Sequence, residues 1–554
     1  MNKINMFYWW STMLMVTSMT MMFNGMKMML TKKIIMMEWE LIKLNSSEVN
    51  FMILMDWMSF TFMSTVMMIS SMIIMYSNNY MSEGKYKSKR FIMLINLFIM
   101  SMMLMIISPN MISIMLGWDG LGMVSYCLVI FYSSKKSYNA GMITCLTNRM
   151  GDIGLLISIS WMMSYGSWHF MFYKELYSNV ISYLIIMSCF TKSAQMPFYS
   201  WLPEAMSAPT PISALVHSST LVTAGIYLSI RFMNKVNKNW MLMMSMLTMM
   251  MSSICANFEF DIKKIIALST LSQLSMMMSS ILLGMKEMSF LHLITHAMFK
   301  SLLFMCAGIM IFYTNNNQDI RNLSQTYKTL PMTTSCFSIS TLALCGIPFM
   351  SGFYSKDLII EMMMTKKMNI ITMFMMNASL GLTMSYSLRM MYFILMKNMK
   401  TKMIIKTKKM NKMKLSTILL TMMSVCLGSL IMWMINLNLK MPIITTMMKI
   451  NPITMIILGM WMGMESFSFK NYLLKNSMYL MNSNMWNILS KMKKNQKMLL
   501  KLSLMFKMKV NSEWGEFYGA MGMSKYLMKT SKMTLMSSKK MMLISMMTWM
   551  MSMM

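Results

Sequence analysis

The feature that most constrains this chain is a succession of apolar stretches, each about as long as a membrane is thick. A helix needs about 20 mostly apolar residues to cross a bilayer. Such stretches recur along most of the 554 residues, and only 12% of the residues are charged, whereas a soluble protein carries about 25%. Because so few charges cannot cover a soluble surface, we predict an all-α polytopic membrane protein with roughly 14–16 transmembrane helices.

Most of the apolar stretches are uninterrupted, and each of these is predicted to form one membrane span. After the first span we expect a polar loop that contains Glu38, Glu40 and Glu48. The uninterrupted stretches are 6–23, 51–76, 91–107, 111–132, 140–163, 209–232, 240–258, 262–283, 290–313, 370–395, 415–434 and 443–462.

Two further apolar segments, 181–204 and 342–361, contain residues that break a helix. Proline lacks the backbone donor and clashes with the preceding turn. In transporters, broken helices mark ion sites near the membrane midplane. Their occurrence in both halves of the chain therefore suggests an internal repeat. The breaking residues are Pro197, Pro203, Gly346, Pro348 and Gly352.

The apolar pattern divides the chain into six regions. The region that begins at 465 is apolar and lysine-rich together, which is typical of a helix lying along a membrane or along the flank of a partner. We expect N-terminal transmembrane helices in 1–108, a first repeat in 109–232, a second repeat in 239–396, further transmembrane helices in 412–464, the amphipathic helix in 465–530 and a C-terminal anchor in 531–554.

Methionine is unusually frequent, with 101 residues. We interpret it as a substitute for leucine and isoleucine on lipid-facing positions; a soft metal- or ligand-binding surface is the alternative. A code that reads an additional AT-rich codon as methionine, as in animal mitochondria, produces this composition. The start of the chain also has no arginine-rich transit pattern. Both observations suit synthesis inside the organelle and hence a place in a mitochondrial membrane.

The sequence predicts no redox cofactor in this chain. Metal and iron–sulfur sites need clustered thiolates, but the eight cysteines are scattered, and no strand precedes a G-x-G-x-x-G motif. The net charge of +33 comes from lysine-rich connections, including 402–414, which favour phospholipid headgroups over nucleic acid. The cysteines are Cys127, Cys145, Cys189, Cys255, Cys306, Cys336, Cys345 and Cys426.

Ionisable residues inside the predicted spans are the candidate functional residues, because a charge at the centre of a membrane helix costs about 2.5–3.5 kcal/mol. Three of them, His292, His296 and Lys300, are spaced four residues apart and share one helix face. Such a row can relay protons; buried structural histidines and a His-x-x-x-His metal site are the alternatives, although Leu293 replaces the glutamate of zinc proteases. The remaining candidates are Asp119, Arg149, Asp152, Lys192, His217 and Lys356.

Several of these residues also permit a purely structural interpretation. Lys192 precedes the first break and can extend from a helix end toward water. Lys356 is followed by an aspartate, with which it can form a loop ion pair. Arg149 and Asp152 are three residues apart and can neutralise each other. Asp119 has no partner nearby in sequence.

Seven stretches together resemble the antiporter-like subunit 5 family of respiratory complex I, the NADH:ubiquinone oxidoreductase. They follow the order of the family across the middle of the chain. The stretches are GWDGLGMVSY (117–126), NRMGDIG (148–154), TKSAQMPFYSWLPEAMSAPTPISALVHSSTLVTAGIYLSIRF (191–232), DIKKIIALSTLSQL (261–274), HLITHAMFKSLLFMCAG (292–308), NQDIRNL (317–323) and GFYSKDLIIE (352–361).

The resemblance implies two inverted five-helix repeats, each with a broken helix, and a lateral helix that ties neighbouring pump subunits together. It implies proton translocation driven by quinone reduction in other subunits, which also bind NADH, FMN, iron–sulfur clusters and ubiquinone. One departure is Asp119, at a position where the family usually has glutamate. The implied relay consists of Asp119, Asp152, Lys192, His217, His292, His296, Lys300 and Lys356.

We therefore expect a switchable ion pair between Asp119 and Lys192 that sends a proton through His217 toward Lys300 and out near Lys356. A subunit of a multisubunit sodium/proton antiporter shares these motifs and is the first alternative. A membrane scaffold with purely structural charges is the second, and the row of two histidines and a lysine is the feature it explains least.

Overall fold

The computed structural model describes residues 6–44, 47–81, 85–169, 179–232, 239–324, 326–366, 369–396, 411–435, 444–465, 482 and 485–553. The chain divides into two compact units, Met1–Met485 and Trp486–Met554. Most of the lysine-rich connection 402–414, much of the first part of the predicted amphipathic helix (466–481 and 483–484) and residue 554 of the predicted anchor lie outside the described residues.

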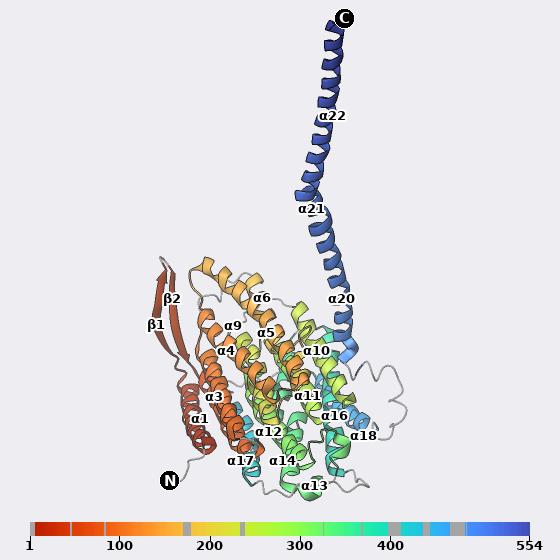
Figure 1. The fold of residues 1–554 in the computed structure, drawn as a ribbon. Helices are drawn as coiled ribbons and strands as arrows, with labels where there is room; N and C mark the ends of the chain where they lie inside the picture. The colour runs from red at the N-terminus through yellow and green to blue at the C-terminus, as the bar shows by residue number, and fades with distance from the viewer. Residues whose placement is uncertain are drawn as a thin grey trace. The chain divides into compact units, whose positions relative to one another are not determined.

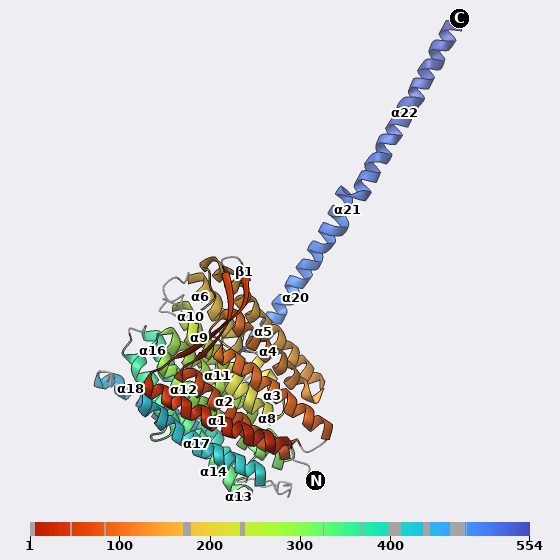
Figure 2. The same ribbon diagram turned by 90° about the vertical axis from the view of Figure 1, so that its left-hand side faces the viewer.

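The first unit is a bundle of helices that run largely side by side (Figures 1 and 2). Among the described residues, eight helices are long and apolar enough to cross a membrane, which confirms the polytopic helical fold. The main helices are α1 (Met6–Thr31), α2 (Trp57–Tyr80), α3 (Lys85–Ile107), α4 (Met111–Val129), α5 (Lys135–Met162), α6 (Asn179–Lys192), α9 (Leu221–Phe232), α10 (Asn239–Phe258), α11 (Ile262–Leu282), α12 (Lys286–Tyr313), α14 (Pro331–Cys345), α15 (Ser351–Met364), α16 (Ile370–Met391), α17 (Asn411–Ile435) and α18 (Thr446–Glu465).

The expected loop between the first two spans is wrong: this segment forms an antiparallel hairpin of β1 (Ile35–Leu44) and β2 (Ser47–Met55). The second span also begins later than predicted, because 51–55 belongs to the strand. The reason is Asp56, which has extended backbone angles and caps α2 by accepting from the backbone N–H of Ser59 at 2.9 Å. A capping residue starts a helix and stops it from extending backwards.

Helix α12 lies inside the bundle and packs against α2, α9, α11, α14, α15 and α17. Nearly all its residues from Ser289 onward are buried. Methionine also fills the interior, beyond the lipid-facing positions expected for it, since an unbranched thioether adapts to irregular gaps. One buried cluster comprises Met246, Met249, Met276, Met285, Ile359, Ile360, Met363, Met376 and Leu380.

The first predicted break is confirmed. Helix α6 ends at Lys192, and after an irregular stretch that contains Pro197 the chain continues through α7 (Trp201–Ala205) and α8 (Thr210–Ile212). Pro203 was expected to break the helix, but it lies in the first turn of α7, where a missing backbone N–H costs nothing. The π-helical segment η3 (Ser213–Thr220) then leads into α9. Such π-helical segments often occur at functional sites, and this one carries His217.

The second break lies between α14 and α15. Gly346 ends α14 in the left-handed region with φ of +81°, a conformation that suits glycine. Gly352 was expected to break the helix as well, but it lies inside α15. A Cβ there would lie 1.8 Å from the carbonyl oxygen of Ala343. This glycine is therefore needed for the close approach of the two half-helices.

The second unit consists of consecutive helical segments: α20 (Ile488–Lys507), the π-helical η8 (Met508–Trp514), α21 (Gly515–Tyr518) and α22 (Ala520–Met553). Within the described chain, no side chain of α22 is buried. Helix α22 continues without interruption across residues 530 and 531, where the amphipathic helix was expected to give way to the anchor.

Candidate functional site

Lys192, the last residue of α6, is fully buried and its ammonium lies against Trp118 of α4. Its Nζ donates to the carbonyl oxygen of Trp118 at 3.3 Å and lies 4.7 Å from the centroid of the indole ring. The indole N–H in turn donates to the carboxylate of Asp152 on α5 at 2.7 Å. Trp118 therefore separates an ammonium from a carboxylate while contacting both. Full burial excludes a Lys192 side chain that reaches the surface.

The expected contact between Asp119 and Lys192 is not formed in the structure. Asp119 instead faces Arg149, whose Nη1 lies 4.0 Å from Oδ1 of Asp119. The same Nη1 lies 3.2 Å from Oδ2 of Asp152. Arg149 thus neutralises Asp152, as their spacing permitted, and also reaches toward the second carboxylate. The side chains of Asp119 and Arg149 are 45% and 53% exposed within this chain.

His217 is buried in η3, and neither ring nitrogen has a hydrogen-bond partner among the described residues. Its ring centroid lies 6.1 Å from that of Trp201. The indole N–H of Trp201 donates to the carbonyl of Thr191 at 3.0 Å, directly before Lys192. Trp201 therefore connects the end of α6 to the imidazole of His217.

His292, His296 and Lys300 form a row along one face of α12, and all three are buried. The ring centroids of His292 and His296 lie 6.1 Å apart. His292 is hydrogen-bonded through both nitrogens, whereas His296 has no such partner among the described residues. Lys300 donates to the hydroxyl of Ser269 on α11 at 2.5 Å.

Lys356 lies within α15 and is buried, so it does not belong to a loop. Its Nζ donates to Thr383 on α16 at 3.1 Å and to the carbonyl of Leu344 at 3.4 Å. Among the described residues it forms no ion pair with the neighbouring Asp357, which was the structural alternative. The lysine instead bridges the second break, because Leu344 belongs to α14.

The structure thus gathers the predicted residues into two groups. Asp119, Arg149, Asp152 and Lys192 form the first group at α4, α5 and α6. The α12 row and Lys356 form the second, with His217 on the intervening segment η3. Sequence reasoning missed the contacting residues Trp118, Gln273, Ser269, Ser355 and Thr383, all but the last of which lie within the family-like stretches.

A further buried cation, Lys263, was also missed. It lies at the start of α11, and its Nζ donates to the carbonyl of Ala208 at 3.2 Å. The described residues contain no group of three or more histidine, cysteine, aspartate or glutamate side chains placed to hold a metal ion.

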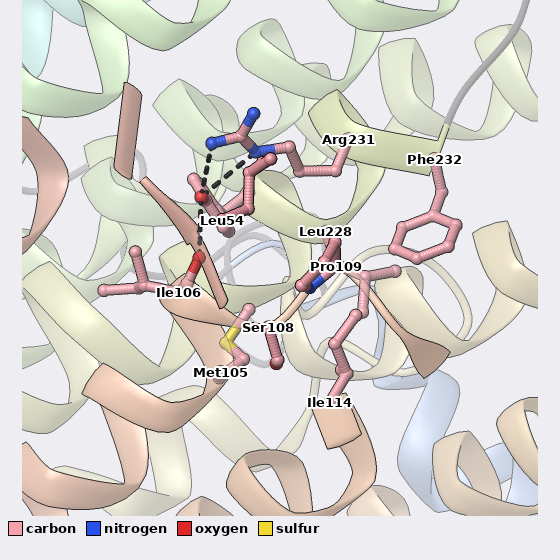
Figure 3. A pocket seen from close by; sticks show the side chains of 10 residues that line it. Leu54, Met105, Ile106, Ser108, Pro109, Ile114, Leu228, Arg231 and Phe232 are labelled. Atoms are coloured by element: carbon pink, nitrogen blue, oxygen red, sulfur yellow. Dashed lines mark hydrogen bonds between the residues drawn. The ribbon is translucent and has the colours of Figure 1, made fainter. Parts of the chain in front are cut away.

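A small pocket lies apart from both groups, between β2, the end of α3, the start of α4 and α9 (Figure 3). Arg231 lies on its wall and forms a bidentate ion pair with Asp56, at 2.5 and 2.7 Å. Burial raises the pKa of Asp56, but hydrogen bonds and charge from Arg231 and the N–H of Ser59 outweigh it and hold the pKa below its ordinary value. The pair fixes the hairpin to α9 and is structural.

Comparison with protein families gives a consistent result along the chain. Residues 39–92 match "NADH-Ubiquinone oxidoreductase (complex I), chain 5 N-terminus". Residues 108–383 match "NADH:quinone oxidoreductase/Mrp antiporter, TM", and residues 386–554 match "NADH dehydrogenase subunit 5 C-terminus".

Among solved structures, the Mrp complex from Dietzia sp. DQ12-45-1b superposes with a TM-score of 0.69 at 20% identity, over 87% of this chain and 57% of that chain. This likeness concerns the fold alone.

Curated relatives named NADH-ubiquinone oxidoreductase chain 5 align over most of the chain. The Anopheles gambiae protein is 48% identical over 85% of this chain and 82% of its own length. The Lumbricus terrestris protein is 40% identical over 91% and 90%, respectively. With three family matches in succession and relatives aligned almost end to end, the chain belongs to the chain 5 family of NADH-ubiquinone oxidoreductase, complex I.

Proposed function

We propose that this chain translocates protons across the mitochondrial inner membrane as a core subunit of complex I, through the two groups of buried residues. One observation carries the proposal. Lys192, Lys300 and Lys356 are all buried inside the bundle, and among the described residues none forms an ion pair with a carboxylate. Buried charges are usually paired; Lys192 and Lys356 also lie at the two helix breaks and Lys300 lies on the α12 row, so these three lysines are suited to gaining and losing protons.

In the first group, Arg149 acts as the movable charge. It lies 3.2 Å from Asp152 and 4.0 Å from Asp119, so a small side-chain movement transfers its charge from one carboxylate to the other. When Arg149 leaves Asp152, that carboxylate stabilises an ammonium at Lys192 through Trp118. When Arg149 returns, the stabilisation is withdrawn and Lys192 releases a proton. This exchange replaces the direct contact of Asp119 with Lys192 as the switch.

The released proton passes along the bundle toward α12. Trp201 fixes His217 near the end of α6, and segment η3 packs against α12. Buried polar groups without protein partners commonly bind water, so water molecules complete the steps between His217 and His296. The proton then moves along the row between His296, Lys300 and His292, and the second break at Lys356 forms the exit.

The energies involved are of a suitable size. Moving one charge against 100 mV costs about 2.3 kcal/mol. A change of two pKa units in a lysine corresponds to about 2.7 kcal/mol. The driving energy comes from quinone reduction in other subunits, which hold NADH, FMN, the iron–sulfur clusters and ubiquinone, and this chain holds no redox cofactor of its own.

The partners proposed for this chain are the neighbouring antiporter-like subunits and phospholipids. Asp119 and Arg149 are half exposed in the middle of α4 and α5, amid exposed apolar residues. Charges in contact with lipid tails are costly, so a neighbouring subunit covers this flank. The lysines of α20 and α22 suit a lateral helix that contacts further subunits and anionic headgroups.

Replacement of Lys300 by methionine tests the proposal. The variant removes the protonatable group and keeps the length of the side chain, so we expect complex I to assemble and oxidise NADH while the number of protons moved per electron falls. Lys264→Met is the matched control, because Lys264 is half exposed and pairs with Asp261. An unchanged proton ratio in Lys300→Met would refute the relay.

The antiporter alternative has its own expected result. The fold is shared with the Mrp complex, so sodium transport by the purified complex must be measured in the same vesicles. A native gel of solubilised mitochondria, stained for NADH oxidation and analysed by mass spectrometry, locates the chain directly. Its presence in the active band supports complex I, whereas migration with other ion-transport subunits supports the antiporter.

A further inference from the structure

His292 differs from the other buried histidines of the proposed relay because both of its ring nitrogens are hydrogen-bonded. Its Nδ1 lies 2.8 Å from the hydroxyl oxygen of Ser355 on α15, and its Nε2 lies 3.2 Å from Oε1 of Gln273 on α11. His217 and His296 have no hydrogen-bond partner among the described residues. Three helices therefore combine to hold this one imidazole.

The two hydrogen-bond partners of His292 differ in whether they can donate a hydrogen. The amide oxygen of Gln273 can only accept a hydrogen bond, so Nε2 of His292 must carry a hydrogen. The hydroxyl of Ser355 can donate or accept, so Nδ1 is the nitrogen whose proton can change. When the imidazole is neutral, the hydroxyl donates to Nδ1. When the imidazole is protonated, Nδ1 donates and the hydroxyl hydrogen turns to another acceptor.

A second acceptor for that hydrogen is present. The hydroxyl oxygen of Thr295 lies 3.1 Å from that of Ser355, and the carbonyl oxygen of Gly352 lies at 3.4 Å. The side chains of the network are all buried, namely His292, Gln273, Ser355 and Thr295. The hydroxyl of Ser355 therefore has one arrangement for each charge state of His292, and neither leaves its hydrogen without an acceptor.

We propose that Gln273 and Ser355 are positioning residues that make His292 exchange its proton through Nδ1 alone, toward α15. A proton bound at Nδ1 enters or leaves by way of Ser355: as the imidazolium gives up its Nδ1 hydrogen to the serine oxygen, the serine passes its own hydrogen either directly to a water molecule or to Thr295, which releases its own hydroxyl hydrogen to water. The imidazole and both hydroxyls are then neutral, and the proton leaves on water. Serine is neutral before and after the step, and one proton has moved.

The position of Ser355 gives this arrangement a consequence for coupling. Ser355 lies on the half-helix that follows the second break, directly before Lys356 in sequence. Movement of α15 at the break changes the Nδ1–hydroxyl distance, and a hydrogen bond weakens steeply beyond its normal range. Any displacement of α15 at the break would therefore alter the proton exchange of His292.

Three variants at these positions test the inference, which rests on the proposed relay. Ser355→Ala removes the exchange route, and we expect proton translocation to slow about tenfold, the order of effect of one lost hydrogen bond to a charged group. Ser355→Thr keeps the hydroxyl and should restore the rate. Gln273→Glu places a carboxylate on Nε2, holds the imidazolium and should block translocation, whereas Gln273→Leu frees the ring and slows it less.

Ser351→Ala is the matched control. Ser351 lies one turn earlier on α15, is buried, and its hydroxyl has no hydrogen-bond partner among the described residues. The readouts are the proton-to-electron ratio in vesicles, the solvent deuterium isotope effect on translocation, and the KM for quinone, which should stay constant. A structural role alone would alter assembly without changing the isotope effect.

The outcomes separate this inference from the function on which it rests. If Lys300→Met leaves the proton ratio unchanged, the relay itself fails. If Lys300→Met abolishes translocation but Ser355→Ala and Gln273→Glu behave like Ser351→Ala, the relay stands and the roles of Ser355 and Gln273 are refuted.

Discussion

The ammonium of Lys192 rests on the indole of Trp118, 4.7 Å from the ring centroid, and donates to the carbonyl of the same residue at 3.3 Å. The N–H of the same indole donates a hydrogen bond to the carboxylate of Asp152. A cation and an anion on different helices thus interact through one aromatic residue. This arrangement lets the charge of Asp152 influence Lys192 without a fixed salt bridge.

Trp118→Phe tests that arrangement. Phenylalanine keeps a ring face and the backbone carbonyl for Lys192 but removes the N–H that donates to Asp152. A lost hydrogen bond to a charged group costs about 1.5–3 kcal/mol, so we expect proton translocation to fall about tenfold or more while NADH oxidation by the uncoupled enzyme is retained. The proton-to-electron ratio in vesicles provides the measurement. A wild-type ratio would show that Asp152 acts independently of Trp118.

Much of the fold was predictable because the membrane imposes a length and a polarity on each span. Spans such as 262–283 correspond closely to α11, and the break after Lys192 followed from Pro197, which cannot continue a helix. The hairpin was not predictable from hydropathy. The apolar run 51–55 continues into α2 without a change of character, and only the cap at Asp56 separates strand from helix.

The site was predictable as a set of residues but not as a set of contacts. Charged residues in spans are rare enough to be recognised singly, and the spacing of His292, His296 and Lys300 places them on one face. Partners come from helices far apart in the chain: Trp118 and Lys192 are 74 residues apart. Nothing in local sequence indicates that Arg149 rather than Lys192 lies beside Asp119. The boundaries of the two repeats remain predictions.

The buried pair of Asp56 and Arg231 gives a stability prediction. Removing one partner of a buried ion pair costs about 3–5 kcal/mol, so Asp56→Ala should increase hydrogen exchange at the amides of β2 and the end of α9. Asp261→Ala is the control, because its pair with Lys264 is about half exposed and such pairs contribute about 0–1 kcal/mol. Equal exchange in the two variants would contradict a structural role for the buried pair.

The same pair predicts a dependence on acid. Because the pKa of Asp56 is lower in the folded chain than its ordinary value, the carboxylate contributes its full stability above the unfolded pKa of about 3.9. That contribution is lost as the pH falls through the folded pKa. Protection of β2 in the native chain should therefore decrease on acidification below about pH 4, and Asp56→Asn should remove this part of the decrease. The measurement is hydrogen exchange as a function of pH, corrected for the intrinsic rate.

The second break gives a packing prediction. Gly352→Ala places a Cβ 1.8 Å from the carbonyl oxygen of Ala343, and backbone on both sides must move to accept it. We expect little assembled complex I on a native gel. Gly122→Ala is a suitable comparison, since its Cβ meets Lys192 Nζ at an ordinary 3.8 Å, and its complex should assemble. Normal assembly of Gly352→Ala would show that α14 and α15 can separate freely.

Lys263 is predicted to be a buried lysine that supports the structure and does not carry protons. It lies at the start of α11 and donates to the carbonyl of Ala208, in the stretch between α7 and α8. Lys263→Met should release that stretch and reduce the yield of assembled complex, yet each assembled complex should move the normal number of protons per electron. Lys356→Met should do the reverse, because Lys356 lies at the proposed exit. Measuring the proton ratio and the yield together separates the two roles, and a lowered ratio in Lys263→Met would place this residue in the relay as well.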